Sequence, residues 1–134
     1  MAAGKPSVTF DDHELVALTK DIERAARIMP AEAAKVVTKA AVNIKNDARR
    51  RVSGLAHAPA YPYAIGFDDV QVTTTYAKTA VGPDKDKRQG ALGNILEYGT
   101  RKNPPVPHLG PAAEAEEPRF ARAMDELAAK VLPQ

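Results

Sequence analysis

The chain has 134 residues, enough for one domain, and a formal net charge of +2 at neutral pH, too small to indicate a nucleic-acid-binding protein by itself. There is no cysteine, which excludes disulfides and thiolate metal sites, and no apolar run approaches the length of a membrane span. The residues after Met1 lack the apolar core of a secretory signal, so we expect a cytosol-like compartment.

The first half of the chain predicts two consecutive helices. Residues 1–10 show no periodicity and are expected to form a flexible leader, and residues 11–134 to form a single domain. Apolar residues at steps of three and four predict a helix from His13 to Met29, which Pro30 stops or kinks. A second helix is predicted from Ala31 to Val52, with Ser53-Gly54 as its C-terminal stop.

The middle of the chain predicts a small sheet. Leu55–Gly66 contains two prolines and no period, which indicates an extended connector. The runs Val70–Thr75 and Ala77–Val81 are rich in β-branched residues and predict two antiparallel strands. Asp84–Gly90 is highly charged and is expected to form a mobile loop.

The last third predicts a short helix, a stiff arm and a final helix. The short helix should end at Gly99, which is expected to adopt a positive φ. Thr100–Gly110 holds three prolines and predicts an extended arm that either docks on a neighbouring subunit or forms a rigid crossover within one subunit. Pro111 is expected to open a short helical turn, and Pro118 the final helix.

Taken together, these elements predict the α+β class. The expected fold has long N-terminal helices packed on a small antiparallel sheet, with a C-terminal helix that closes the core.

The residues that could carry catalysis do not form a recognisable constellation. His13, His57 and His108 lie in three separate segments, without the helical spacing of paired metal ligands, and surface or capping roles are expected for them. The adjacent carboxylates stand where elements begin, which is typical of capping. Nucleophile and phosphate-binding motifs are also absent from the sequence, so we expect no enzyme and no cofactor.

Basic residues are concentrated in two places. From Lys35 to Arg51 six cationic residues face Asp47 alone, whereas the segment from Asn103 onward is acidic. This asymmetry indicates either head-to-tail docking between copies or two solvated helix faces. Two clusters could contact DNA phosphates without sequence specificity, although no aromatic residue lies among them to stack on bases. Their residues are Arg49, Arg50 and Arg51, and Lys85, Lys87 and Arg88.

The most distinctive stretch is NILEYGTRKNPPVPHLGP, residues 94–111. It resembles the neck or tail-completion proteins of siphophages, of the minor tail protein Z type. Their pattern is an aliphatic or aromatic residue, Glu, an aromatic residue, Gly-Thr, a polar spacer, Pro-x-Pro, an apolar pair and a proline that opens the last helix. The matching residues are Glu97, Tyr98, Gly99, Thr100, Pro105, Pro107, His108, Leu109 and Pro111. His108 departs from the pattern, which often has an aromatic hydrophobe at this position.

The resemblance implies a structural subunit of the head-to-tail connector, located in the virion neck and assembled in the host cytoplasm. It implies a ring of identical copies, expected to be six, between portal-side adaptor or stopper proteins and the tail terminator or tail tube. Nonspecific contact with packaged DNA is a further expectation, and no membrane partner is expected. The alternatives are a tail terminator protein or an accessory nucleic-acid-binding protein.

Overall fold

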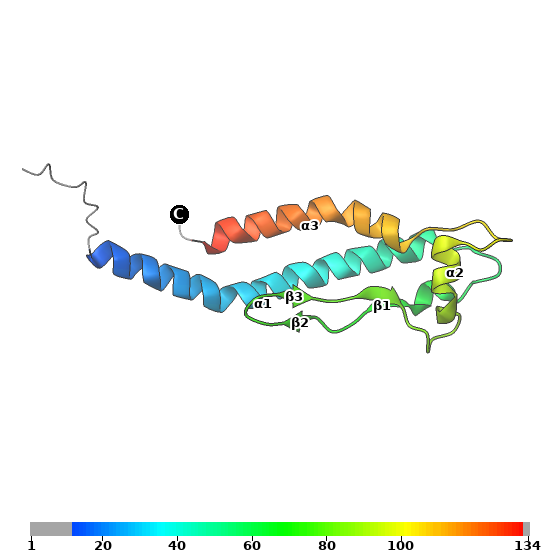
Figure 1. Ribbon diagram of the computed structural model, residues 1–134, viewed down its shortest axis with the longest axis horizontal. Coiled ribbons are helices and arrows are strands. Elements are labelled where there is room, and N and C mark those ends of the chain that lie inside the picture. The colour runs from blue at the N-terminus through cyan, green and yellow to red at the C-terminus, as the bar shows by residue number, and fades with distance from the viewer. Residues whose placement is uncertain (1–11, 133–134) are drawn as a thin grey trace, which may run out of the picture.

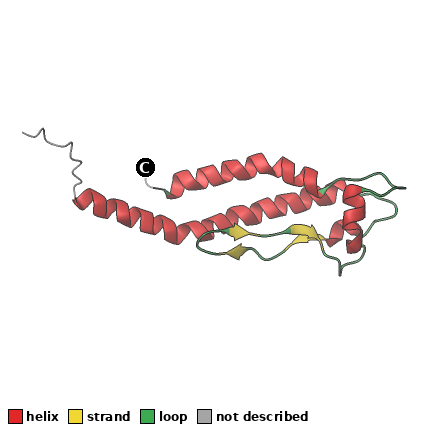
Figure 2. Ribbon diagram, in the orientation of Figure 1, coloured by secondary structure: helices red, strands yellow, loops and turns green. Residues whose placement is uncertain are grey.

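A computed structural model describes residues 12–132, so the predicted leader at residues 1–10 lies outside the described residues. Helix α1 (Asp12–Arg51) spans most of the length of the elongated molecule, and α3 (Leu109–Val131) lies antiparallel beside it (Figure 1). Short antiparallel strands pack on another side of α1 (Figure 2). The predicted α+β fold, with long N-terminal helical structure, a small sheet and a C-terminal helix, is therefore confirmed.

Helix α1 differs from the prediction because it is one helix of 40 residues rather than two. Pro30 lies inside it and removes one backbone N–H donor, and the ribbon bends where its colour passes from blue to cyan (Figure 1). The helix continues because packing against α3 begins on the N-terminal side of Pro30, at Ala25, and extends well beyond it. Tertiary packing thus outweighs the local cost of proline.

The strands form one long hairpin that is paired at both ends. At its base β1 (Ile65–Phe67) pairs with β4 (Val81–Pro83), and near its tip β2 (Gln71–Val72) pairs with β3 (Ala77–Lys78). The prediction of antiparallel strands is confirmed, but the paired segments are shorter than expected. The predicted connector, Leu55–Gly66, includes the first two residues of β1.

The rest of that connector is more ordered than its prolines predicted. It contains a 3-10 helix, η1 (Tyr61–Ala64), whose first two residues are buried. The expected short helix is present as η2 (Gly90–Leu92) followed by α2 (Gly93–Tyr98). Helix α3 begins at Leu109 and continues through Pro118, so the prediction that Pro118 opens the final helix was wrong.

Two apolar clusters hold these elements together. The junction core lies where the C-terminal half of α1 meets η1, β1, α2 and the start of α3, and its buried residues are Ala48, Val52, Ala58, Tyr61, Ile65, Leu96 and Ala112. The helix-pair core lies between α1 and the C-terminal half of α3, around Ala25, Leu127 and Val131. The 94–111 segment packs against the junction core, which fixes its position relative to α1.

Candidate interaction site

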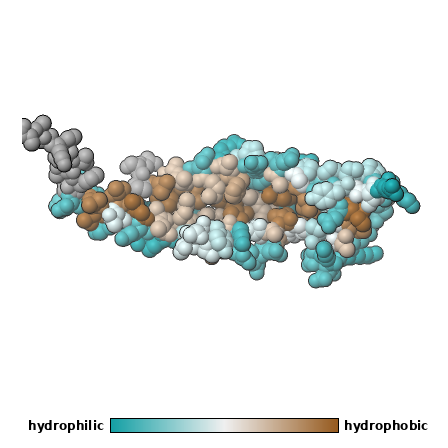
Figure 3. All heavy atoms as spheres, viewed as in Figure 1, coloured by the Kyte–Doolittle hydropathy of each residue, from teal (hydrophilic) through white to brown (hydrophobic). Residues whose placement is uncertain are grey.

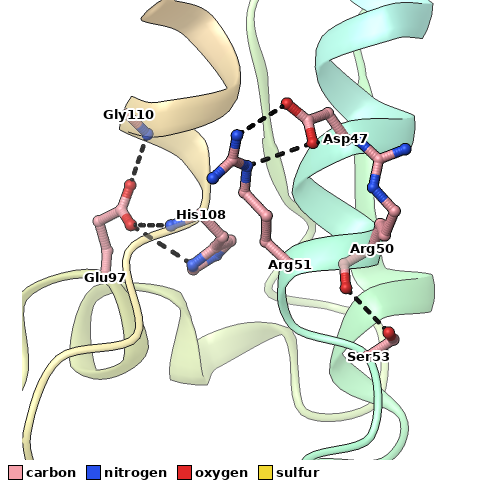
Figure 4. A network of polar contacts seen from close by, with 7 residues as sticks. All are labelled: Asp47, Arg50, Arg51, Ser53, Glu97, His108 and Gly110. Carbon is pink, nitrogen blue, oxygen red and sulfur yellow. Dashed lines mark hydrogen bonds and ion pairs between the residues drawn. The ribbon is translucent and has the colours of Figure 1, made fainter. Parts of the chain in front are cut away.

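Glu97 connects α2 to the first turn of α3. Its carboxylate accepts hydrogen bonds from the backbone N–H of His108 at 2.6 Å and from that of Gly110 at 2.8 Å (Figure 4). The first turn of a helix has N–H groups without intrahelical partners, and its dipole favours a negative charge there. A carboxylate from another helix therefore caps α3, in place of the side chain at its own N-cap position.

His108 is completely buried, so the expectation that it has a surface or capping role was wrong. Its Nδ1 lies 2.9 Å from the carbonyl oxygen of Val106, and its Nε2 lies 2.6 Å from the hydroxyl of Tyr61. Because a carbonyl oxygen only accepts, Nδ1 carries the proton, and the hydroxyl of Tyr61 then donates to Nε2. The two rings also meet edge to face, with centroids 5.2 Å apart.

Burial raises the pKa of Tyr61, and the nearby negative charge of Glu97 raises it further, to about 12. Its hydroxyl consequently remains a hydrogen-bond donor over the physiological pH range. Since Tyr61 and His108 are both fully buried, neither side chain can reach a solvent-borne substrate. The Tyr61–His108–Glu97 arrangement is a structural junction, and sequence reasoning missed Tyr61 because no periodicity pairs it with residue 108.

The predicted arm divides into an inward part and an exposed part. Val106 and Leu109 pack against the junction core, and the N–H of Val106 donates to the carbonyl of Leu96 at 2.6 Å. These contacts correspond to the second alternative, a rigid crossover within one subunit. By contrast, residues 101–105 are all exposed, and so is Tyr98, with 78% of its surface accessible.

Gly99 makes this change of direction possible. Its φ is +76°, as expected, and its ψ of 179° belongs to a backbone region that is essentially restricted to glycine. A Cβ at this position would lie 2.8 Å from the nitrogen of Pro105 and 2.9 Å from the carbonyl oxygen of Asn103. The turn at residues 100–103 therefore folds tightly against Gly99.

The remaining motif residues complete this turn and the start of α3. Thr100 accepts hydrogen bonds from the backbone of Lys102 and Asn103 through its Oγ1, while Pro107 is exposed and Pro111 is half-buried in α3.

The three consecutive arginines all make internal contacts. Arg49 donates from Nε and Nη2 to the carbonyl oxygen of Ile65, at 3.0 and 2.7 Å, and so ties β1 to α1. Arg50 and Arg51 both bind the buried carboxylate of Asp47 (Figure 4). Burial opposes the ionisation of Asp47, but the hydrogen bonds and charges of Arg51 and Arg50 outweigh it and lower the pKa of this carboxyl.

Lys85, Lys87 and Arg88 lie at the same end of the molecule as the arginines. Arg49 binds Ile65, and the N–H of Asp84 binds the neighbouring carbonyl of Ala64, so both basic clusters flank β1. The side chains in the loop are exposed and make no ion pair within the part of the chain that the structure describes. Of the two basic clusters, the loop is therefore the one whose side chains are better placed to meet an external anion.

Neither a metal site nor a membrane span is found in residues 12–132. These residues contain no group of three or more potential metal ligands, and none of their helices is long and apolar enough to cross a membrane. Comparison of the chain with family models, with curated proteins and with solved structures finds no match.

Proposed function

We propose that the chain is a structural, non-catalytic subunit of a siphophage neck, where copies form a ring that joins the DNA-filled head to the tail. The tail-completion position is our first choice. The main support is that the residues behind the family resemblance form one continuous structural unit. Glu97 caps α3, Gly99 turns the chain and His108 fills the junction core.

This unit gives the molecule a stiff exposed end. The turn at residues 101–105 has Gly99 packed against its base, and Tyr98 stands beside it on α2. A turn that is already ordered loses little conformational entropy on binding, which suits a contact that must be repeated identically around a ring. The exposed aromatic ring of Tyr98 supplies the kind of anchor that is enriched in protein interfaces.

The experiment is deletion of the gene from the phage genome that encodes this chain, followed by electron microscopy of the particles. The proposal expects filled heads and separate tails of normal length, and joining should be restored by purified protein. Tails of uncontrolled length would instead indicate the tail-terminator alternative. Normally joined particles would refute a neck function altogether.

A point variant tests the exposed end itself. Tyr98→Ser should fold normally and fail to restore joining, whereas Tyr76→Ser, at an exposed tyrosine of the hairpin, should restore it. If both variants restore joining equally, Tyr98 is not an interface residue.

A further inference from the structure

The first 13 residues of α1, Asp12–Arg24, extend beyond the end of α3 and form a segment that we call the overhang. Every residue in it is exposed, including the four large apolar residues Leu15, Val16, Leu18 and Ile22, which are 47–53% accessible. Figure 3 shows hydrophobic surface on the part of α1 that protrudes beyond α3. Contiguous apolar surface of this kind usually marks a place where another molecule binds.

The overhang continues the seam along which α3 already packs. Leu15, Leu18 and Ile22 follow the three-and-four spacing that leads to Ala25, and Ala25 is buried in the helix-pair core against Leu127 and Val131. The same stripe is therefore covered by a helix from Ala25 onward and uncovered before it. A helical surface is the natural complement for this stripe.

Charges beside the stripe argue against two overhangs pairing with each other. At 100° per residue, Glu14 and Asp21 lie along one side of the stripe, and Asp12 and Thr19 lie along the other. Lys20 and Arg24 point away from it, and so does Val16, so the apolar stripe itself consists of Leu15, Leu18 and Ile22. Two overhangs packed stripe to stripe, parallel or antiparallel, would place carboxylates opposite carboxylates or opposite an uncharged threonine, so like charges would repel and no ion pair would form along the edges. The complementary surface must be apolar with basic edges.

A groove of about 510 Å³ between α1 and α3 has this character. Its apolar residues are Val36, Ala40, Phe120 and Ala123. Lys35 and Lys39 line it from α1, and Arg119 and Arg122 line it from α3. Basic residues thus lie on both helices of the groove. They can face the carboxylates that lie on both sides of the overhang stripe.

The free cations in this groove sharpen the match. Three carboxylates also line it: Glu32, which Lys35 binds at 3.0 Å, Glu116, which Arg119 binds at 3.1 Å, and Glu126, which makes no ion pair within residues 12–132. Lys39 and Arg122 also make no ion pair within residues 12–132, so the four cations exceed the three carboxylates by one and the groove keeps a net positive charge for an incoming carboxylate.

A second groove along α3, next to the hairpin, has the opposite charge. It shares the apolar character of the first, but Lys78 is its one lining cation, against Glu114, Glu116 and Glu117. The acidic overhang would meet like charges there, so the charges select the groove between α1 and α3.

We propose that the overhang of one copy binds the groove between α1 and α3 of a second copy, as a third helix added to that pair. The contact is heterologous, because the overhang and the groove are different surfaces, and such contacts build rings or open arrays rather than closed dimers. It develops the self-assembly part of the proposed function, but its test needs only the purified chain. Its failure can therefore be distinguished from failure of the joining experiment.

The absence of cysteine from the sequence allows a direct test by site-specific cross-linking. Leu18→Cys and Ala123→Cys are made in separate preparations, which are oxidised alone and as a mixture at high protein concentration. We expect a covalent dimer in the mixture and almost none in either preparation alone. Lys20→Cys, on the opposite side of the overhang, is the matched control and should not cross-link to Ala123→Cys.

Two results would overturn the proposal. Cross-linking of Leu18→Cys to itself as efficiently as to Ala123→Cys would mean that overhangs pair with each other. A mixture that yields no more dimer than the Lys20→Cys control would mean that the overhang does not occupy this groove. Circular dichroism of each variant checks that the substitutions, at exposed Leu18 and Lys20 and half-buried Ala123, leave the fold intact.

Charge reversal provides a second readout of the same contact. Asp21→Lys, introduced into the Leu18→Cys chain, should lower the dimer yield with Ala123→Cys several-fold. Arg122→Glu, introduced into the Ala123→Cys chain, should restore much of that yield. An unchanged yield with Asp21→Lys would contradict the role assigned to the basic edges.

Discussion

The hydroxyl of Tyr61 lies 2.6 Å from Nε2 of His108, although 47 residues separate the two in the chain, and both side chains are fully buried. Tyr61→Phe removes this donor and leaves Nε2 without its partner. The expected loss in the free energy of unfolding is about 1–3 kcal/mol, measured by urea denaturation. Tyr63→Phe, at a highly exposed position of the same short helix, should change it by less than about 0.5 kcal/mol.

Glu97→Gln should also destabilise the isolated chain. The two N–H groups bind different oxygens of the carboxylate, and in glutamine one of these positions becomes an NH2 group that cannot accept a hydrogen bond. The negative charge at the N-terminus of α3 is also lost. We expect a loss of about 1–2 kcal/mol in urea denaturation. Glu114→Gln, at an exposed position of α3, is the control, and an equal effect of the two would contradict the capping role.

Gly99→Ala tests whether the turn depends on glycine. Both the backbone conformation and the contacts of the added Cβ are unfavourable, so we expect a loss of about 1–3 kcal/mol. Gly54→Ala separates the two causes, because Gly54 has a φ of +83° but no atom within 4 Å of the added Cβ. Gly54→Ala should therefore lower the free energy of unfolding by less than Gly99→Ala does. A larger loss for Gly54→Ala would show that the close contacts of the added Cβ with Pro105 and Asn103 are easily relieved.

The ion pairs of Asp47 predict a specific pH dependence. A carboxyl whose pKa is lowered by folding stabilises the protein above its unfolded pKa of about 3.9, and this contribution disappears as the pH falls through the folded value. The double variant Arg50→Gln, Arg51→Gln should therefore be less stable than the unmodified chain at pH 7, by about 1 kcal/mol given the exposure of Arg50. This difference in the free energy of unfolding should become smaller well below pH 4, where Asp47 is protonated in both proteins. A difference that does not change with pH would mean that the arginines stabilise the fold by packing instead of by charge.

The structure changes which basic residues are the better candidates for DNA contact. Lys85, Lys87 and Arg88 are exposed, so replacing all three with Gln should weaken nonspecific DNA binding without lowering stability. The logarithm of the DNA association constant falls linearly with the logarithm of the salt concentration. Each lost phosphate contact should make this slope shallower by about 0.9, measured between 50 and 200 mM salt. Arg49→Gln should instead lower stability, because it releases the carbonyl of Ile65. An unchanged slope in the triple variant would mean that this loop does not bind DNA.

The sequence predicted the parts of the fold that depend on local signals. The apolar stripes placed the helices, and Gly99 was correctly expected to stop α2 with a positive φ. The errors concern positions where distant contacts override local cost. Pro30 and Pro118 both lie inside helices because those helices pack along each other, which no local pattern reports.

The candidate site was predictable only in outline. The 94–111 motif identified the right segment, but not that His108 would be buried, because its partner Tyr61 lies in a connector without periodicity. Similarly, the arginine run indicated an exposed basic surface. Its carbonyl and carboxylate partners, Ile65 and Asp47, could be assigned only from the folded chain.

The helix-pair core also sets the order in which the chain can fold during synthesis. Ala25 is covered by Leu127 and Val131, more than 100 residues later, so that part of α1 has no intramolecular cover until α3 has been made. At a translation rate of about 5–20 residues per second, this apolar stripe stays open for several seconds or longer on every ribosome. Nascent chains on one message therefore display the same uncovered surface at high local concentration, and a chaperone or an early contact between copies would shield it.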